Sequence, residues 1–110
     1  MPQPPAQPMA TPFLFDACEV RTAVADDGEV WFCAKDVYEA LGISWSGGAG
    51  LKNLPENWKV VLYLQTSFGG KEAYFLSEAA VYKTTFSSRK PQAVEFANWV
   101  CGEVLPALRK

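Results

Sequence analysis

The chain has 110 residues, of which 49% are hydrophobic and 20% are charged, a size and composition that predict one folded domain with its own core. It contains no histidine, which excludes Ser-His-Asp and Cys-His catalysis and the usual zinc sites with imidazole ligands. Its formal net charge of −2 excludes a strongly basic domain, the most direct sign of nucleic-acid binding.

The charge is divided unevenly along the sequence. Residues 1–51 hold two basic and seven acidic side chains, a net charge of −5, whereas residues 52–110 hold eight basic and five acidic ones, a net charge of +3. A polyanion is therefore expected to meet the second half of the chain, provided that the fold gathers these cations on one face.

The N-terminal segment is rich in proline. Residues 1–12 hold five prolines, so we expect a disordered arm there and one folded domain over 13–110. The sequence has neither the roughly 20 consecutive apolar residues of a membrane span nor the pattern of a signal peptide. Its three cysteines lack CxxC spacing and read as reduced, buried thiols. We therefore expect a cytoplasmic protein with no membrane partner, metal or cofactor.

A hairpin and a short helix are predicted first along the folded part. Alternating apolar residues favour strands over 18–25 and 29–33, joined by an Asp27-Gly28 turn that needs positive φ. The segment 34–43 then predicts a short helix that Gly42 ends. The glycine-rich stretch from Ser44 to Trp58 predicts a loop.

The second half of the sequence predicts another hairpin and two helices. Strands are expected over 58–66 and 73–76, and Ser77 is placed to cap a helix that ends near Phe86. A final helix begins at Pro91, and Pro106 is expected to kink or end it. Together the elements predict an α+β fold, a small antiparallel sheet built from two β-hairpins and packed against three helices.

Three features could suggest catalysis or phosphate binding but have simpler explanations. Asp36 and Glu39 share one short helix, yet an exposed acidic face explains them without a catalytic pair. The glycine-rich loop lacks the Gly-Lys-Ser/Thr ending of a phosphate-binding loop. Cys33 and Cys101 have no histidine to form a thiolate pair, which favours core cysteines.

Basic side chains gather at the turn between the last two predicted helices. Lys83, Arg89 and Lys90 surround this turn, and Ser87 and Ser88 beside them can donate hydrogen bonds to phosphate. The final helix also begins here with free backbone N–H groups. The turn is therefore a candidate phosphate site, although a solvated turn with a capping serine accounts for the same residues.

Other candidate contacts lie outside this turn. Arg109 and Lys110 follow the final helix, and Lys52 and Trp45 lie in the glycine-rich loop. Trp45 or Trp99 could stack on a base. A tryptophan in a small domain is, however, more often part of the core.

Two ordered motifs run through the sequence. The first has a V-R strand, a D-G turn, a W/F-F-x-A-x-D-V run and an A-L-G helix end, represented by Val20, Arg21, Asp27, Gly28, Trp31, Phe32, Ala34, Asp36, Val37, Ala40, Leu41 and Gly42. The second has S-E-x-x-x-Y, S-x-K-P-x-A, F-x-x-W-V and E-V-L-P-x-[IL]-R, represented by Ser77, Glu78, Tyr82, Ser88, Lys90, Pro91, Ala93, Phe96, Trp99, Val100, Glu103, Val104, Leu105, Pro106, Leu108 and Arg109. In this order they resemble the N-terminal domain of the BRO family, found in prophage antirepressors and baculovirus BRO proteins, over residues 13–110.

The resemblance implies a non-enzymatic, DNA-binding module that regulates phage transcription in the cytoplasm of a bacterial host. The basic and serine residues named above would contact the phosphates of duplex DNA. Such proteins commonly carry a separate C-terminal domain, and some counter a phage repressor. An interaction module that binds a repressor, or a second copy as a homodimer, is the alternative. As part of F-x-x-W-V, Trp99 is expected to be a structural wedge.

Overall fold

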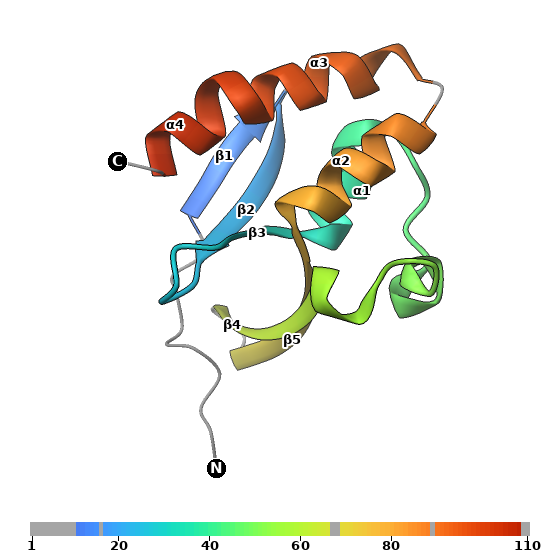
Figure 1. Cartoon of the computed structure of the whole chain (residues 1–110). Helices are drawn as coiled ribbons and strands as arrows, with labels where there is room; N and C mark the ends of the chain where they lie inside the picture. Colours follow the sequence, from blue (N-terminus) through green and yellow to red (C-terminus); the bar gives the residue numbers. More distant parts are fainter. Residues whose placement is uncertain (1–10, 16, 67–68, 89, 109–110) are drawn as a thin grey trace.

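The computed structural model describes residues 11–15, 17–66, 69–88 and 90–108 (Figure 1). The strands are β1 (Thr11–Phe15), β2 (Cys18–Val24), β3 (Val30–Cys33), β4 (Lys59–Thr66) and β5 (Gly69–Ser77). The helices are α1 (Ala34–Leu41), α2 (Glu78–Ser87), α3 (Pro91–Trp99) and α4 (Leu105–Leu108), with 3-10 helices η1 (Gly47–Leu51) and η2 (Glu56–Trp58) and a π-helical turn η3 (Val100–Val104). This mixture confirms the predicted α+β class.

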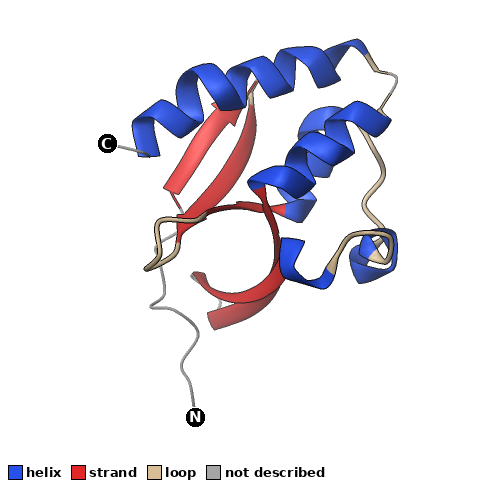
Figure 2. Cartoon of the chain, viewed as in Figure 1, coloured by secondary structure: helices blue, strands red, loops and turns tan. Residues whose placement is uncertain are grey.

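The described strands form one antiparallel sheet in the order β1-β2-β3-β5-β4. Both predicted hairpins are present, because β2 pairs with β3 and β4 pairs with β5 along its whole length. The two hairpins join where Phe32 of β3 lies opposite Leu76 of β5. Figure 2 shows that the sheet bends between its β1-β2-β3 part and the β4-β5 hairpin.

β1 is a strand that the sequence patterns did not predict. The strand begins at Thr11 and pairs with β2, with Phe13 opposite Val20. Phe15 is buried and packs edge-on against Phe96, at 5.1 Å between ring centroids. This contact between residues far apart in sequence stabilises a strand whose own alternation is too short to be recognised. Residues 1–10 lie outside the described part, so the disordered arm stays a prediction.

The helix ends follow the predicted signals. Gly42 ends α1 with a φ of 72°, in the left-handed region that favours glycine. The side-chain oxygen of Ser77 accepts the backbone N–H of Ala80 at 3.2 Å, which caps the start of α2 as expected. These two ends fix where the chain leaves one element and enters the next.

The final helix is not ended by Pro106, so the expected stop is wrong. The turn before Pro106 has π geometry, in which the backbone N–H of Leu105 bonds to the carbonyl of Val100, and the helix continues to Leu108. A π turn is a known way for a helix to absorb an irregularity. Figure 1 shows the result, a long helical segment that runs across β1 and β2.

The core lies between this sheet and the helices. Its fully buried side chains come from the strands and from the helices alike: Val20, Phe32, Val37, Leu41, Leu76, Val81, Phe96, Val100 and Val104. Trp99 is half-buried and packs against Phe15 and Phe96, with centroids 5.2 and 5.5 Å apart, as expected of a structural wedge. Leu51 is also fully buried, which anchors the predicted loop to the core. No helix in the described ranges is long and apolar enough to cross a membrane.

Two glycines offer a matched test of the α1 end. A Cβ at Gly42 would need left-handed backbone and would lie 2.8 Å from Nε2 of Gln92, whereas a Cβ at Gly102 would meet nothing within 4 Å. We expect Gly42→Ala to lower the free energy of unfolding by about 1–2 kcal/mol. We expect Gly102→Ala to raise it by about 0.5–1 kcal/mol, because alanine is the better helix former. Urea denaturation followed by circular dichroism measures both, and equal effects would contradict the assignment of Gly42.

Candidate nucleic-acid interface

The first motif of the sequence contains a partly buried ion pair between Arg21 and Asp36. Asp36 lies in the first turn of α1 and is 5% exposed. Its carboxylate accepts the backbone N–H of Arg21 at 2.9 Å, the Nε–H at 2.8 Å and an Nη2–H at 3.1 Å. The expected exposed acidic face is therefore wrong for Asp36, although Glu39 is exposed. The sequence could not show this, because the partner of Asp36 lies on another element.

Arg21 and the nearby Cys33 both have raised pKa values. The hydrogen bond that Arg21 donates to Asp36 raises the pKa of Arg21 above its ordinary value, so the guanidinium stays charged. Burial raises the pKa of the Cys33 thiol, whose sulfur lies 3.4 Å from Nη2 of Arg21. A thiol with a raised pKa is a poor nucleophile. Cys33 thus fits the predicted core cysteine.

The basic turn of the sequence lies beside a groove of about 230 Å³, which we call the α2 groove. Its lining comes from α1, the loop that follows α1, and α2: Tyr38, Ile43, Asn53, Leu54, Lys83, Thr84, Ser87 and Ser88. Lys83 is the charged member of this lining, and none of the lining residues carries a carboxylate. An anion in the groove would therefore meet one cation and several polar side chains.

The structure brings Lys83, Ser87 and Ser88 together, as the sequence predicts. The Lys83 ammonium lies 5.9 Å from the centroid of the Trp58 ring, a cation–π contact that orients it. The Ser87 hydroxyl donates to the carbonyl of Lys83 at 3.0 Å, which occupies its hydrogen. The Ser88 oxygen accepts the backbone N–H of Lys90 at 3.2 Å, which leaves its hydroxyl hydrogen able to donate elsewhere.

Lys90 and Lys52 lie near the α2 groove without lining it. The ammonium of Lys90 donates to the carbonyl of Gly42, so this side chain also ties the start of α3 to the end of α1. Lys52 is exposed and directly precedes Asn53 of the groove lining. Both lysines thus belong to the surroundings of the α2 groove. The other three predicted cations lie outside the described residues: Arg89, Arg109 and Lys110.

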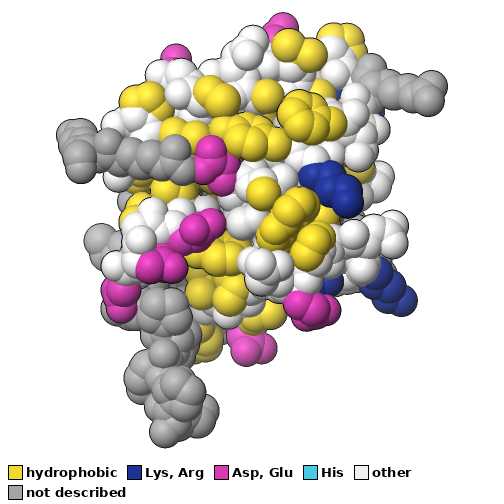
Figure 3. All heavy atoms as spheres, viewed as in Figure 1, with side chains coloured by type: hydrophobic (Ala, Val, Ile, Leu, Met, Phe, Trp, Pro, Cys, Tyr) yellow, Lys and Arg dark blue, Asp and Glu magenta, His cyan; other side chains and the backbone are white. Residues whose placement is uncertain are grey.

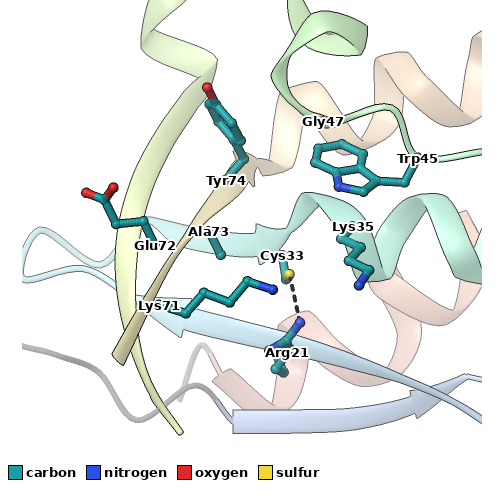
Figure 4. Close-up of a pocket in the computed structure, with 9 residues that line it drawn as sticks. All are labelled: Arg21, Cys33, Lys35, Trp45, Gly47, Lys71, Glu72, Ala73 and Tyr74. Carbon is teal, nitrogen blue, oxygen red and sulfur yellow. Dashed lines mark hydrogen bonds between the residues drawn. The ribbon is translucent and has the colours of Figure 1, made fainter. Parts of the chain in front are cut away.

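Trp45 does not line the α2 groove but a second cavity, of about 250 Å³, which we call the Trp45 pocket (Figure 4). Its lining residues come from β2, β3, α1, β5 and the loop after α1: Arg21, Cys33, Lys35, Trp45, Gly47, Lys71, Glu72, Ala73 and Tyr74. Of this set, the sequence indicated only Trp45 as a candidate contact. Only the fold brings together three cations that lie 14 or more positions apart in the chain.

Basic and acidic side chains are separated on one face of the molecule. On the face drawn in Figure 3, the Lys and Arg side chains lie toward the right, and most of the acidic side chains lie to the left and below. Hydrophobic side chains occupy much of the area between them. Among the described residues, no group of three or more Cys, Asp or Glu side chains could hold a metal ion.

Comparisons with known proteins agree with the two motifs. The sequence matches the model of the BRO family, N-terminal domain, over residues 19–106. It is 36% identical over 98 residues to an uncharacterized protein of Haemophilus influenzae, covering 89% of this chain and 49% of that protein. It is 29% identical over 98 residues to the Bro-N domain-containing protein 289L of Invertebrate iridescent virus 6, covering 73% of this chain and 24% of that protein.

The chain spans about half the length of the first relative and about a quarter of the second. No solved structure matches the chain.

The Arg21–Asp36 pair can be tested against its exposed neighbour. We expect Asp36→Ala to lower the free energy of unfolding by about 2–3 kcal/mol, because it leaves Arg21 without its partner in a partly buried place. Glu39→Ala on the same helix is the control and should change stability by less than about 0.5 kcal/mol. Equal losses in urea denaturation would show that the ion pair does not hold α1 to β2.

Proposed function

The chain belongs to the BRO family, whose N-terminal domain it matches over residues 19–106, and on this basis we propose that it binds duplex DNA. It would do so as a module of a phage-type transcription regulator. The α2 groove and its surrounding lysines are the proposed contact surface. The role is non-enzymatic, and the setting that fits it is the cytoplasm of a bacterial host.

The observation that carries this proposal is the lining of the α2 groove. Lys83 enters it beside two side chains that can donate hydrogen bonds, Asn53 and Ser88, whereas the Thr84 hydroxyl donates to the carbonyl of Ala80; no lining residue carries a carboxylate. Phosphate oxygens accept hydrogen bonds and carry negative charge, so both features suit a DNA backbone. The cation–π contact with Trp58 limits the freedom that Lys83 would lose on binding.

The acidity of the whole chain sets the expected strength. A net charge of −2 means that binding depends on a local patch rather than on the overall field. Four cations lie in or next to this patch along the sequence: Lys52, Lys83, Arg89 and Lys90. If three or four phosphates are neutralised, affinity should fall about 40- to 150-fold between 50 and 200 mM salt.

A protein-interaction module is the second candidate, and exposed apolar side chains favour it. Phe86 of α2 is 82% exposed and Val94 of α3 is 67% exposed. Val61 and Tyr63 are also exposed on β4, which is an edge strand of the sheet. A phage repressor or a second copy of this chain could use such surfaces.

Lys83→Gln tests the proposed DNA contact. The change keeps a polar group on a flexible side chain and removes one charge from the α2 groove, so we expect the Kd for a short duplex to rise about 3- to 10-fold at low salt. The slope of log Kd against log salt should fall by about one unit. Arg89→Ala combined with Lys90→Ala should weaken binding further. Fluorescence anisotropy of a labelled duplex measures each value.

Glu29→Gln is the control for net charge alone. It changes the net charge by one unit at an exposed position that lines neither the α2 groove nor the Trp45 pocket, and should change the duplex Kd less than about twofold. Two results would overturn the proposal: no duplex binding by the unaltered chain at low salt, or a change in Kd for Lys83→Gln no larger than that for Glu29→Gln. Capture of a repressor without duplex binding would establish the interaction module instead.

A further inference from the structure

We propose that the Trp45 pocket holds one unpaired nucleotide of a DNA strand, with the base against Trp45 and the phosphate between Lys35 and Lys71. This inference rests on the proposed DNA binding and adds to it a second, strand-selective contact. The α2 groove would hold the duplex backbone, and the Trp45 pocket would hold a nucleotide that has left its pair.

The volume of the Trp45 pocket restricts the size of the ligand that can enter it. At about 250 Å³ it lies just below the range of cavities that enclose drug-sized molecules. A double helix cannot enter a cavity of this size, whereas a single base can. An enclosed aromatic wall also has little to offer a paired base, whose faces are covered by its neighbours in the stack.

The charges in the pocket favour an anion. Lys35 on α1 and Lys71 on β5 are both exposed, and neither forms an ion pair with another described residue. Figure 4 shows the Lys71 side chain reaching toward Arg21 and Cys33 inside the pocket. Arg21 is held in place by Asp36, so this part of the wall is fixed before a ligand arrives. A phosphate between the two lysines would neutralise charges that lack a partner.

Glu72 does not cancel this positive charge. Glu72 lines the pocket together with Lys71, but it is directed elsewhere. In Figure 4 the Glu72 carboxylate points away from the Lys71 ammonium. The carboxylate of Asp36 is occupied by three N–H groups of Arg21.

The aromatic wall is preformed. The Trp45 ring packs edge-to-face against Tyr38, with centroids 5.1 Å apart, so one side of the indole is held by the protein. On the other wall, Gly48 lies so close to Tyr74 that a Cβ would be 2.6 Å from the tyrosine oxygen. The glycine-rich turn therefore sits directly on Tyr74. Preformed rings lose little entropy when a base stacks on them.

The two proposed sites share a wall. Tyr38 lines the α2 groove, and its packing partner Trp45 lines the Trp45 pocket. A strand bound along the groove could therefore pass a nucleotide over this aromatic pair without leaving the protein surface. Proteins that remove a base from a duplex use such adjacent aromatic pockets to hold it.

The test compares two DNA probes on the full chain. The first is the labelled duplex used above, and the second is a labelled oligothymidylate of about eight nucleotides, a length that one small binding domain covers. The variant with Lys35→Gln and Lys71→Gln should bind the oligothymidylate at least about tenfold more weakly, and its duplex Kd should change about threefold or less. Lys83→Gln is the reciprocal control, with the larger loss expected on the duplex.

Substitution of Trp45 separates stacking from charge. Trp45→Ala should weaken oligothymidylate binding about 5- to 50-fold, because base stacking is lost, and Trp45→Phe should recover most of the affinity. Thermal denaturation checks folding, and if Trp45→Ala does not fold, Trp45→Phe and the lysine variant decide the result. The proposal is overturned if the unaltered chain binds the duplex but not the oligothymidylate, or if the variant with Lys35→Gln and Lys71→Gln, or a folded Trp45→Ala, binds the oligothymidylate like the unaltered chain. Loss of both probes by the unaltered chain would instead reject DNA binding as a whole.

Discussion

The ion pair between Arg21 and Asp36 joins β2 to α1, the helix that contributes to both candidate sites. Asp36 begins α1, and Arg21 lies in the middle of β2, so their three hydrogen bonds fix the helix against the sheet. From this fixed start, α1 places Tyr38 at the α2 groove and leads into the loop that bears Trp45. A carboxylate this deeply buried needs a charged, hydrogen-bonded partner. The positions of both sites therefore depend on one pairing between distant parts of the sequence.

Much of the fold could be predicted because its signals are local. The Asp27-Gly28 turn, the end of α1 at Gly42 and the Ser77 cap each rest on the conformational preference of one or two residues. What failed depends on contacts between distant residues. β1 forms because Phe15 packs on Phe96, and the buried state of Asp36 follows from Arg21. Neither partner can be read from the spacing of nearby side chains.

The residues of the candidate sites could likewise be predicted only where they lie close together in the sequence. Lys83, Ser87 and Ser88 lie on one helix and its end, so their sequence spacing already placed them together. Lys35 and Lys71 come together only because β5 crosses beside the start of α1. The family resemblance identified Arg21 and Asp36 as recurring residues but gave no hint of their contact. Motifs show which positions matter, and only the three-dimensional arrangement shows what each one touches.

The close approach of Gly48 to Tyr74 changes the meaning of the glycine-rich run. Such runs are usually taken as segments selected for freedom of movement. Here the missing side chain leaves room for the phenol ring of Tyr74, which a methyl group at position 48 would have to displace. The two neighbouring glycines are therefore constrained differently, Gly48 by an adjacent aromatic ring and Gly47, whose Cβ direction is open, by its left-handed backbone.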